Sequence, residues 1–260
     1  MGYLAFSLAI MAVTGVTLRG GWRSQNRFQI VGMDAQGLLL GALAVAAAMF
    51  FFGPLFGLAL VLSVAIHEFG HVAAYRVCGH SDARFRLIPL LGGVAISNQA
   101  PASQEKQILI SIMGPAICLG PMLLGFALSE VLPYSMVGLA DFCYTFAIVT
   151  GALNFFNLLP FWPLDGGRIV QILAFSFWPP AATVVATMMS AALIVSAIAL
   201  KSMMLLFFAI MGAQSLVSSH QLVHYQRPMG RPRAVLCLFA YLATLAAFGF
   251  GGLPMLAAYF

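Results

Sequence analysis

Two histidines and a glutamate stand close together in an apolar stretch of the chain. Residues 65–73 read A-I-H-E-F-G-H-V-A, which contains the pattern H-E-x-x-H. An α-helix has 3.6 residues per turn, so positions i and i+4 lie on the same face. His67 and His71 could therefore bind one metal ion, and Glu68 could take a proton from a water molecule beside it. Zinc is the metal that these side chains indicate.

The apolar setting makes this pattern informative. H-E-x-x-H arises by chance in many soluble proteins, where solvent accounts for the polar side chains. Here it lies inside an apolar run from about Leu55 to Val77. A charged side chain at the centre of a bilayer costs about 3 kcal/mol on insertion scales. The sequence therefore favours a metal site over a chance match.

The composition is that of a membrane protein. Of the 260 residues, 62% are hydrophobic and only 7% are charged, whereas a soluble domain has about 25% charged residues. We expect an all-α polytopic protein in a lipid bilayer. The formal charge of +5 indicates arginine-rich cytoplasmic loops rather than nucleic-acid binding. The four cysteines form no C-x-x-C pair, so neither disulfides nor a cysteine metal site is predicted.

Apolar segments predict about six to eight transmembrane helices. They are residues 1–18, 38–52, 55–77, 106–131, 136–159, 181–200, 202–218 and 234–258. If the loops 19–35, 76–106, 159–180 and 219–233 face the cytoplasm, eleven of the twelve Lys and Arg residues lie there. This distribution satisfies the positive-inside rule. We expect a multi-pass protein of a prokaryotic plasma membrane, with the H-E-x-x-H end facing the cytoplasm.

The segment from Phe85 to Ile96 predicts a β-hairpin. Two short apolar runs flank Leu91-Gly92-Gly93, and a Gly-Gly pair favours a tight turn. Such strands lie at membrane depth only against protein or a water-filled cavity. An exposed edge there could pair with an extended peptide. Residues 28–33 could form another strand at the membrane surface.

A second notable stretch reads N-L-L-P-F-W-P-L-D-G-G-R at 157–168. The prolines break a helix, and Asp165 could cap a new one that begins near Gly167. Gly166 and Gly167 permit a close approach of two backbones. Alone, this is an ordinary Asp-Gly-Gly turn. Together with H-E-x-x-H, it makes Asp165 a candidate third ligand, since two histidines leave a zinc site one protein ligand short.

Three other features have weaker interpretations. The S-I-M-G-P stretch at 111–115 is either a kinked packing segment or part of the chemistry, and both remain open. His220 and His224 have i, i+4 spacing but lack a glutamate and stand near three arginines. We interpret them as a solvated pair. Asp141 is expected near the outer interface rather than in catalysis.

The two main motifs, in this order, resemble the site-2 protease family of intramembrane zinc metalloproteases. The H-E-F-G-H sequence at 67–71 is followed about 90 residues later by the stretch at 157–168, with a Gly-Pro element between them. The resemblance implies three core transmembrane helices and one zinc ion per chain. His67, His71 and Asp165 would bind the zinc, and Glu68 would be the general base. Asn157 would position substrate or stabilise the oxyanion.

The resemblance covers residues 28–175 and implies a domain organisation. We expect an N-terminal transmembrane helix and basic loop at 1–27, the protease core at 28–175, and C-terminal transmembrane helices at 176–260. The hairpin would match a membrane-embedded sheet that holds a substrate strand. We expect no inserted PDZ-like domain between the motifs and no appended nucleotide-sensing domain after residue 180.

The implied function is hydrolysis of a peptide bond within or near a transmembrane segment, in regulated intramembrane proteolysis. Its substrate would be a transmembrane protein or a membrane-retained peptide. Two alternatives stay open. One is a divalent metal transporter, which would bind the ion transiently with the same side chains. The other is a non-catalytic relative that binds membrane helices without cutting them. The sequence does not indicate an oligomeric state.

Overall fold

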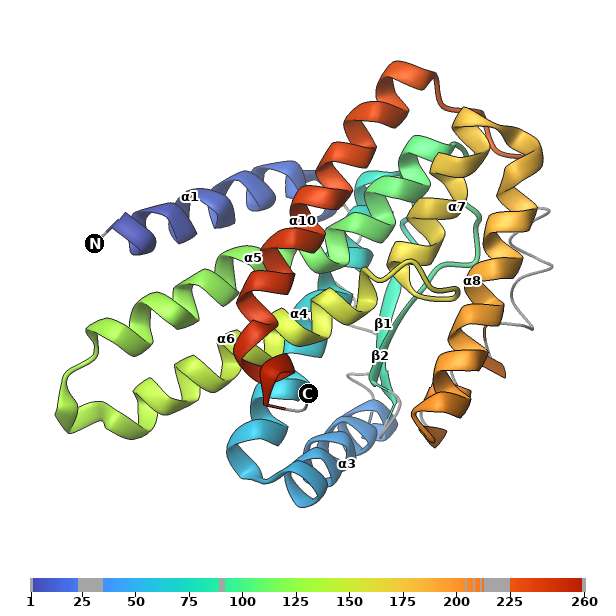
Figure 1. Ribbon diagram of the computed structural model, residues 1–260. Helices are drawn as coiled ribbons and strands as arrows, with labels where there is room; N and C mark the ends of the chain where they lie inside the picture. The colour runs from blue at the N-terminus through green and yellow to red at the C-terminus, as the bar shows by residue number, and fades with distance from the viewer. Residues whose placement is uncertain are drawn as a thin grey trace. The chain divides into compact units, whose positions relative to one another are not determined.

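The computed structural model describes residues 2–22, 35–88, 92–203, 205–207, 209–210, 212 and 225–258. The expected strand at 28–33 and the pair His220 and His224 lie outside these residues. The described chain is mostly helical (Figure 1). Its helices are α1 (Gly2–Thr17), α2 (Arg19–Trp22), α3 (Ala35–Phe52), α4 (Pro54–Val77), α5 (Gln104–Val131), α6 (Val137–Asn157), α7 (Asp165–Phe177), α8 (Pro179–Ala199) and α10 (Arg231–Ala257).

Five of the described helices are long and apolar enough to cross a membrane. They are α4, α5, α6 with the 3-10 turn before it, α8 and α10. Two further apolar stretches, Gly2–Thr17 and Leu39–Phe52, are shorter helices. The prediction of an all-α integral membrane protein with a small β-hairpin is confirmed.

The chain divides into two compact units. The first contains Met1–Gln99, Met113–Phe155 and Ala246–Phe260, and the second contains Ala100–Ile112 and Phe156–Leu245. The divisions fall within α5, α6 and α10, so each of these helices contributes to both units. The three consecutive domains expected from the sequence stay a prediction.

In the first unit, α3 and α4 form a tight helical hairpin. Gly53 joins them with a φ of 85°, a conformation that glycine adopts without a steric penalty. Pro54 follows as the first residue of α4, where its missing N–H is not needed. A methyl group on Gly57 would overlap the backbone of Ala48. The two helices therefore touch backbone to backbone at this glycine.

The predicted hairpin is present beside α4 (Figure 1). β1 (Arg84–Ile88) and β2 (Gly92–Ile96) pair antiparallel. The carboxylate of Asp82, before β1, accepts the backbone N–H of Asn98, after β2, at 2.6 Å, and the hydroxyl of Ser97 at 3.1 Å. The hydrogen bond from Asn98 is the main cause that lowers the pKa of Asp82 below its usual value. A charged carboxylate thus ties the two ends of the hairpin together.

The expected position of the turn was wrong. Gly92 and Gly93 are not the turn but the first two residues of β2, with Gly93 opposite Leu87. The reason is close packing: a methyl group on Gly93 would overlap the Cγ of Glu68 on α4. A glycine inside a strand commonly marks such a close approach.

The C-terminal end of α10 packs onto α6 within the first unit. A methyl group on Gly151 of α6 would overlap the backbone of Gly251 and Gly252. Gly251 also lies against the side chain of Met122 on α5. Small residues allow this approach, which drives helix association where lipid removes the hydrophobic effect.

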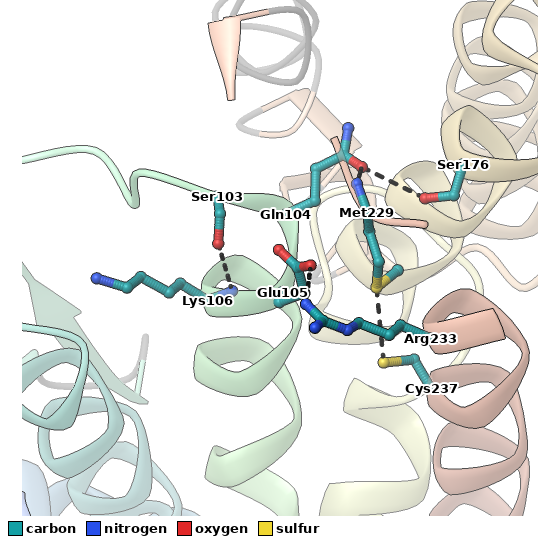
Figure 2. A network of polar contacts seen from close by, with 8 residues as sticks. All are labelled: Ser103, Gln104, Glu105, Lys106, Ser176, Met229, Arg233 and Cys237. Carbon is teal, nitrogen blue, oxygen red and sulfur yellow. Dashed lines mark hydrogen bonds and ion pairs between the residues drawn. The ribbon is translucent and has the colours of Figure 1, made fainter. Parts of the chain in front are cut away.

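In the second unit, a buried glutamine joins three segments (Figure 2). Gln104, at the start of α5, is fully buried, and its Oε1 accepts the backbone N–H of Met229 at 2.8 Å and the hydroxyl of Ser176 at 3.3 Å. Arg233 and Glu105 form an ion pair at 3.1 Å beside it. This pair is largely exposed, so it contributes at most about 1 kcal/mol. The buried glutamine therefore links the start of α5, α7 and the segment before α10 within this unit.

Candidate metal centre

The two histidines of α4 face each other, as their helical spacing predicts. His67 and His71 are buried, with 4% and 7% of their surface exposed. Their Nε2 atoms lie 3.0 Å apart, and their rings are nearly perpendicular with centroids 4.7 Å apart. Two nitrogen lone pairs at this distance repel each other unless a proton or a cation lies between them. Either one ring donates an N–H to the other here, or a cation binds between the two nitrogens.

The separation of the two nitrogens fits zinc. Two imidazole nitrogens bound tetrahedrally to one zinc ion, each at 2.0–2.1 Å, lie about 3.3 Å from each other. The observed Nε2–Nε2 distance of 3.0 Å is a few tenths of an ångström shorter. A small rotation of either ring would therefore bring both nitrogens into zinc geometry.

Glu68 is a residue of α4, and its side chain contacts the hairpin. Its side chain is half-buried, and its Cγ packs directly against Gly93 of β2. A methyl group on Gly93 would also lie 3.0 Å from the ring of Phe85 and 3.2 Å from Val64. The carboxylate is next to the histidines in sequence, and the hairpin backbone limits where its side chain can go.

A glycine of α5 makes room for the ring of His71. A methyl group on Gly114 would overlap the imidazole of His71, including its Nε2. A methyl group on Gly70, next to this histidine, would likewise overlap the backbone carbonyl of Met113. These contacts support the packing interpretation of the stretch at 111–115. They also show that this packing limits the position of the His71 ring, which is a candidate metal ligand.

Asn154 is a site residue that the sequence analysis left without a role. It lies on α6, is fully buried, and its Oδ1 is 2.7 Å from the Nδ1 of His67. Its Nδ2 donates to the backbone carbonyl of Thr150 at 2.8 Å. The signal that could have found it is an amide in an apolar segment, because a buried polar group is costly unless it is hydrogen-bonded.

In the second unit, Asp165 is the first residue of α7 and is 8% exposed. The expectation that Asp165 would cap a helix beginning near Gly167 was wrong, because Leu164 occupies the N-cap position. The carbonyl of Leu164 accepts the N–H of Arg168 at 3.1 Å, which starts the helical hydrogen bonding earlier than expected. The Asp165 carboxylate is therefore not used as the cap.

The loop before Asp165 packs closely against the start of α7. Methyl groups on Gly166 and Gly167 would overlap the backbone carbonyls of Leu158 and Phe161, respectively. This is the close backbone approach that the Gly-Gly pair predicts. The indole N–H of Trp162, within the loop, donates to the carbonyl of Gly212 at 2.9 Å. The loop before Asp165 is therefore fixed by its packing against α7 and by the hydrogen bond of its tryptophan.

The candidate residues are distributed over the two units. His67, Glu68, His71 and Asn154 lie in the first, and Asp165 lies in the second. Asn157 is the half-buried last residue of α6 and also belongs to the second unit.

Known proteins share part of this sequence. Residues 133–199, which contain Asn157 and Asp165, match Peptidase family M50. A zinc metalloprotease of Methanocaldococcus jannaschii is 31% identical over 116 residues, which are 44% of this chain and 32% of that protein. Stage IV sporulation protein FB of Bacillus subtilis is 31% identical over 116 residues, which are 45% of this chain and 39% of that protein. The match thus spans about a third of the length of each relative.

Among solved structures, a site-2 protease from Methanocaldococcus jannaschii aligns with a TM-score of 0.46 and 23% identity, over 68% of this chain and 86% of that one. The family description and the name of the first relative agree with the metalloprotease chemistry that the H-E-x-x-H pattern indicates. The chain resembles the class of membrane-embedded metalloproteases. Within that class, the resemblance to the site-2 proteases, Peptidase family M50, is confirmed.

Proposed function

We propose that the protein is a zinc-dependent intramembrane protease. It hydrolyses a peptide bond within or near the transmembrane segment of a membrane protein or of a membrane-retained peptide. The observation that carries the proposal is the buried His67–His71 pair on a membrane-spanning helix, with Nε2 atoms 3.0 Å apart and Glu68 beside them. Such groups are costly at membrane depth and mark functional sites.

His67, His71 and Asp165 would hold the zinc ion. All three side chains are buried, and each offers one ligand atom. Two imidazoles and one carboxylate are a common protein ligand set of catalytic zinc, which leaves a fourth position open. When bound, zinc polarises a carbonyl and lowers the pKa of a water molecule in the site.

The chain's own residues supply the remaining chemistry. Glu68 accepts a proton from the attacking water and returns it to the leaving amine. The amide of Asn157 donates a hydrogen bond to the carbonyl oxygen that gains charge. The substrate helix must first unwind, since its carbonyls are otherwise hydrogen-bonded within the helix. The edge of the β1–β2 hairpin can then pair with the extended segment.

The charge distribution supports an orientation for this reaction. Arg76 lies in the last turn of α4, Arg84 and Arg86 lie in β1, and Arg227 lies shortly before α10. We propose that these parts of the chain face the cytoplasm of a prokaryotic cell and that the cut releases a product on that side. This is the arrangement needed for regulated intramembrane proteolysis.

The ligand set can be tested by metal content. In detergent-purified protein, the wild type is expected to hold about one zinc per chain, the number of ions that one three-ligand site binds. His67→Ala and Asp165→Ala should each lose it, because two ligands do not retain zinc through purification. Elemental analysis beside protein quantification measures this ratio. Asp141→Ala, an exposed aspartate on α6, is the control and should keep the wild-type zinc content.

Two outcomes would contradict this ligand set. Zinc retained in Asp165→Ala would make the Asp-Gly-Gly stretch a structural turn only. A folded wild type that binds no added zinc would remove the basis of the protease proposal.

A substitution in β2 tests the position of Glu68. In Gly93→Ala, the new methyl group overlaps Glu68 Cγ and must displace its side chain. A misplacement of about 1 Å can cost about 100-fold in rate, so cleavage of a transmembrane reporter should fall by about 10- to 100-fold, with zinc content unchanged. Gly138→Ala on α6, where a methyl group meets nothing within 4 Å, should cleave at the wild-type rate. Equal rates in both variants would show that Gly93 does not constrain Glu68.

A further inference from the structure

Two hydrogen bonds of Asn154 together determine how its amide is oriented. One partner is the backbone carbonyl of Thr150, 2.8 Å from Nδ2. A carbonyl oxygen only accepts hydrogen bonds, so the amide NH₂ must face it. The amide oxygen must then face His67, where Oδ1 lies 2.7 Å from Nδ1.

This orientation determines the tautomer of His67. An amide oxygen only accepts, so the ring nitrogen opposite it, Nδ1, must carry the proton. In a neutral imidazole, the other nitrogen, Nε2, then has a free lone pair. Nε2 is the atom that faces His71 at 3.0 Å. The tautomer that can bind a metal through Nε2 is therefore selected by a hydrogen bond on the opposite side of the ring.

We propose that Asn154 is a positioning residue for the metal centre: it holds His67 in the Nδ1–H tautomer and in the ring orientation that presents Nε2 to zinc. The role requires the proposed zinc site but adds a residue outside the ligand set. A neutral amide is suited to this role at membrane depth, because it accepts the Nδ1–H hydrogen bond without adding a second buried charge. The amide is fully buried, so water does not compete for its hydrogen bonds to His67 and Thr150.

Zinc affinity, measured on the full chain in detergent by competition with a chelating dye, tests the role without any cleavage assay. Asn154→Leu has a similar volume and no acceptor. Loss of such a partner typically weakens metal binding by about 10- to 100-fold, and we expect that range. Asn154→Asp keeps an acceptor at the same position and should bind zinc at least about tenfold more tightly than Asn154→Leu, by the same range.

Thr150→Val is the matched control. It lies one turn away on the same helix and is equally buried, and its hydroxyl has no hydrogen-bond partner among the described residues. The substitution keeps the backbone carbonyl that orients Asn154. Zinc affinity should therefore equal that of the wild type. Wild-type affinity in Asn154→Leu, or equal losses in the Leu and Asp variants, would overturn the proposal.

A measurement on unmodified, metal-free protein does not depend on the folding of these Asn154 variants. The ¹⁵N chemical shifts of the imidazoles distinguish the two tautomers, and His67→Gln identifies the signals of His67. We expect a protonated Nδ1 and an unprotonated Nε2 on His67, and the opposite tautomer would overturn the proposal. Absence of zinc binding by the wild type would instead refute the proposed protease function, and the tautomer measurement would still test the hydrogen bond.

Discussion

Replacing Glu68 with glutamine is expected to abolish measurable peptide cleavage while leaving zinc bound. Glutamine has nearly the same size and can still occupy the space against Gly93, but it cannot accept a proton from water. General acid–base catalysis contributes about 100- to 10,000-fold to a rate, and the loss should lie in this range or below detection. The measurement is cleavage of a transmembrane reporter in proteoliposomes, with zinc content determined on the same sample.

Glu130→Gln is the control for this substitution. Glu130 lies on α5 in the same compact unit and is exposed, so the same chemical change there should leave the cleavage rate unaltered. Undiminished cleavage by Glu68→Gln would remove Glu68 as the base. Zinc transport into the vesicles, with no cleavage by the wild type, would favour the transporter interpretation instead.

The second large effect is expected from one methyl group on α5. In Gly114→Ala, the new Cβ overlaps the imidazole of His71. Since α5 is a continuous helix through Gly114, we expect the ring to move rather than the backbone. The ligand nitrogens would then no longer converge, and zinc affinity should fall about 100-fold, the upper end of the range for a perturbed metal site. Cleavage should fall in parallel at limiting zinc.

Stability distinguishes this effect from general damage to the fold. Alanine is favoured over glycine inside a helix by about 0.8–1 kcal/mol, so the thermal transition of metal-free Gly114→Ala should not fall by more than a few degrees. Gly138→Ala, which meets open space, should keep both zinc affinity and stability. Gly114→Ala with wild-type zinc affinity would show that His71 adapts to the methyl group.

Helical periodicity is the reason that the His67–His71 pair could be predicted. Two side chains four residues apart in a helix lie on the same face, independent of the tertiary structure. The long apolar stretches of α4, α5 and α6 are also local features of the sequence, so their helical structure was predictable. The position of Asn154 was not, because it depends on α6 approaching α4, and no local pattern encodes that approach.

The two wrong expectations have a common cause. Gly92 and Gly93 were assigned to a turn, and Asp165 to a helix cap, because those are the usual local uses of these residue types. In the structure, Gly93 packs against Glu68. Asp165 is not the cap but the first residue of the helix itself. At Gly93, a contact with a distant segment overrides the local preference, and single-sequence reasoning sees only the preference.

The contact between Gly151 and the end of α10 bears on how the protein could be shortened. The family match ends at residue 199, which suggests that the last 61 residues could be removed or exchanged. However, the backbone of Gly251 and Gly252 packs against α6 one helical turn from Asn154. A shortened chain that ends at residue 199 would leave this face of α6 open to lipid. Engineered versions should therefore retain α10, even though it contributes none of the proposed ligands.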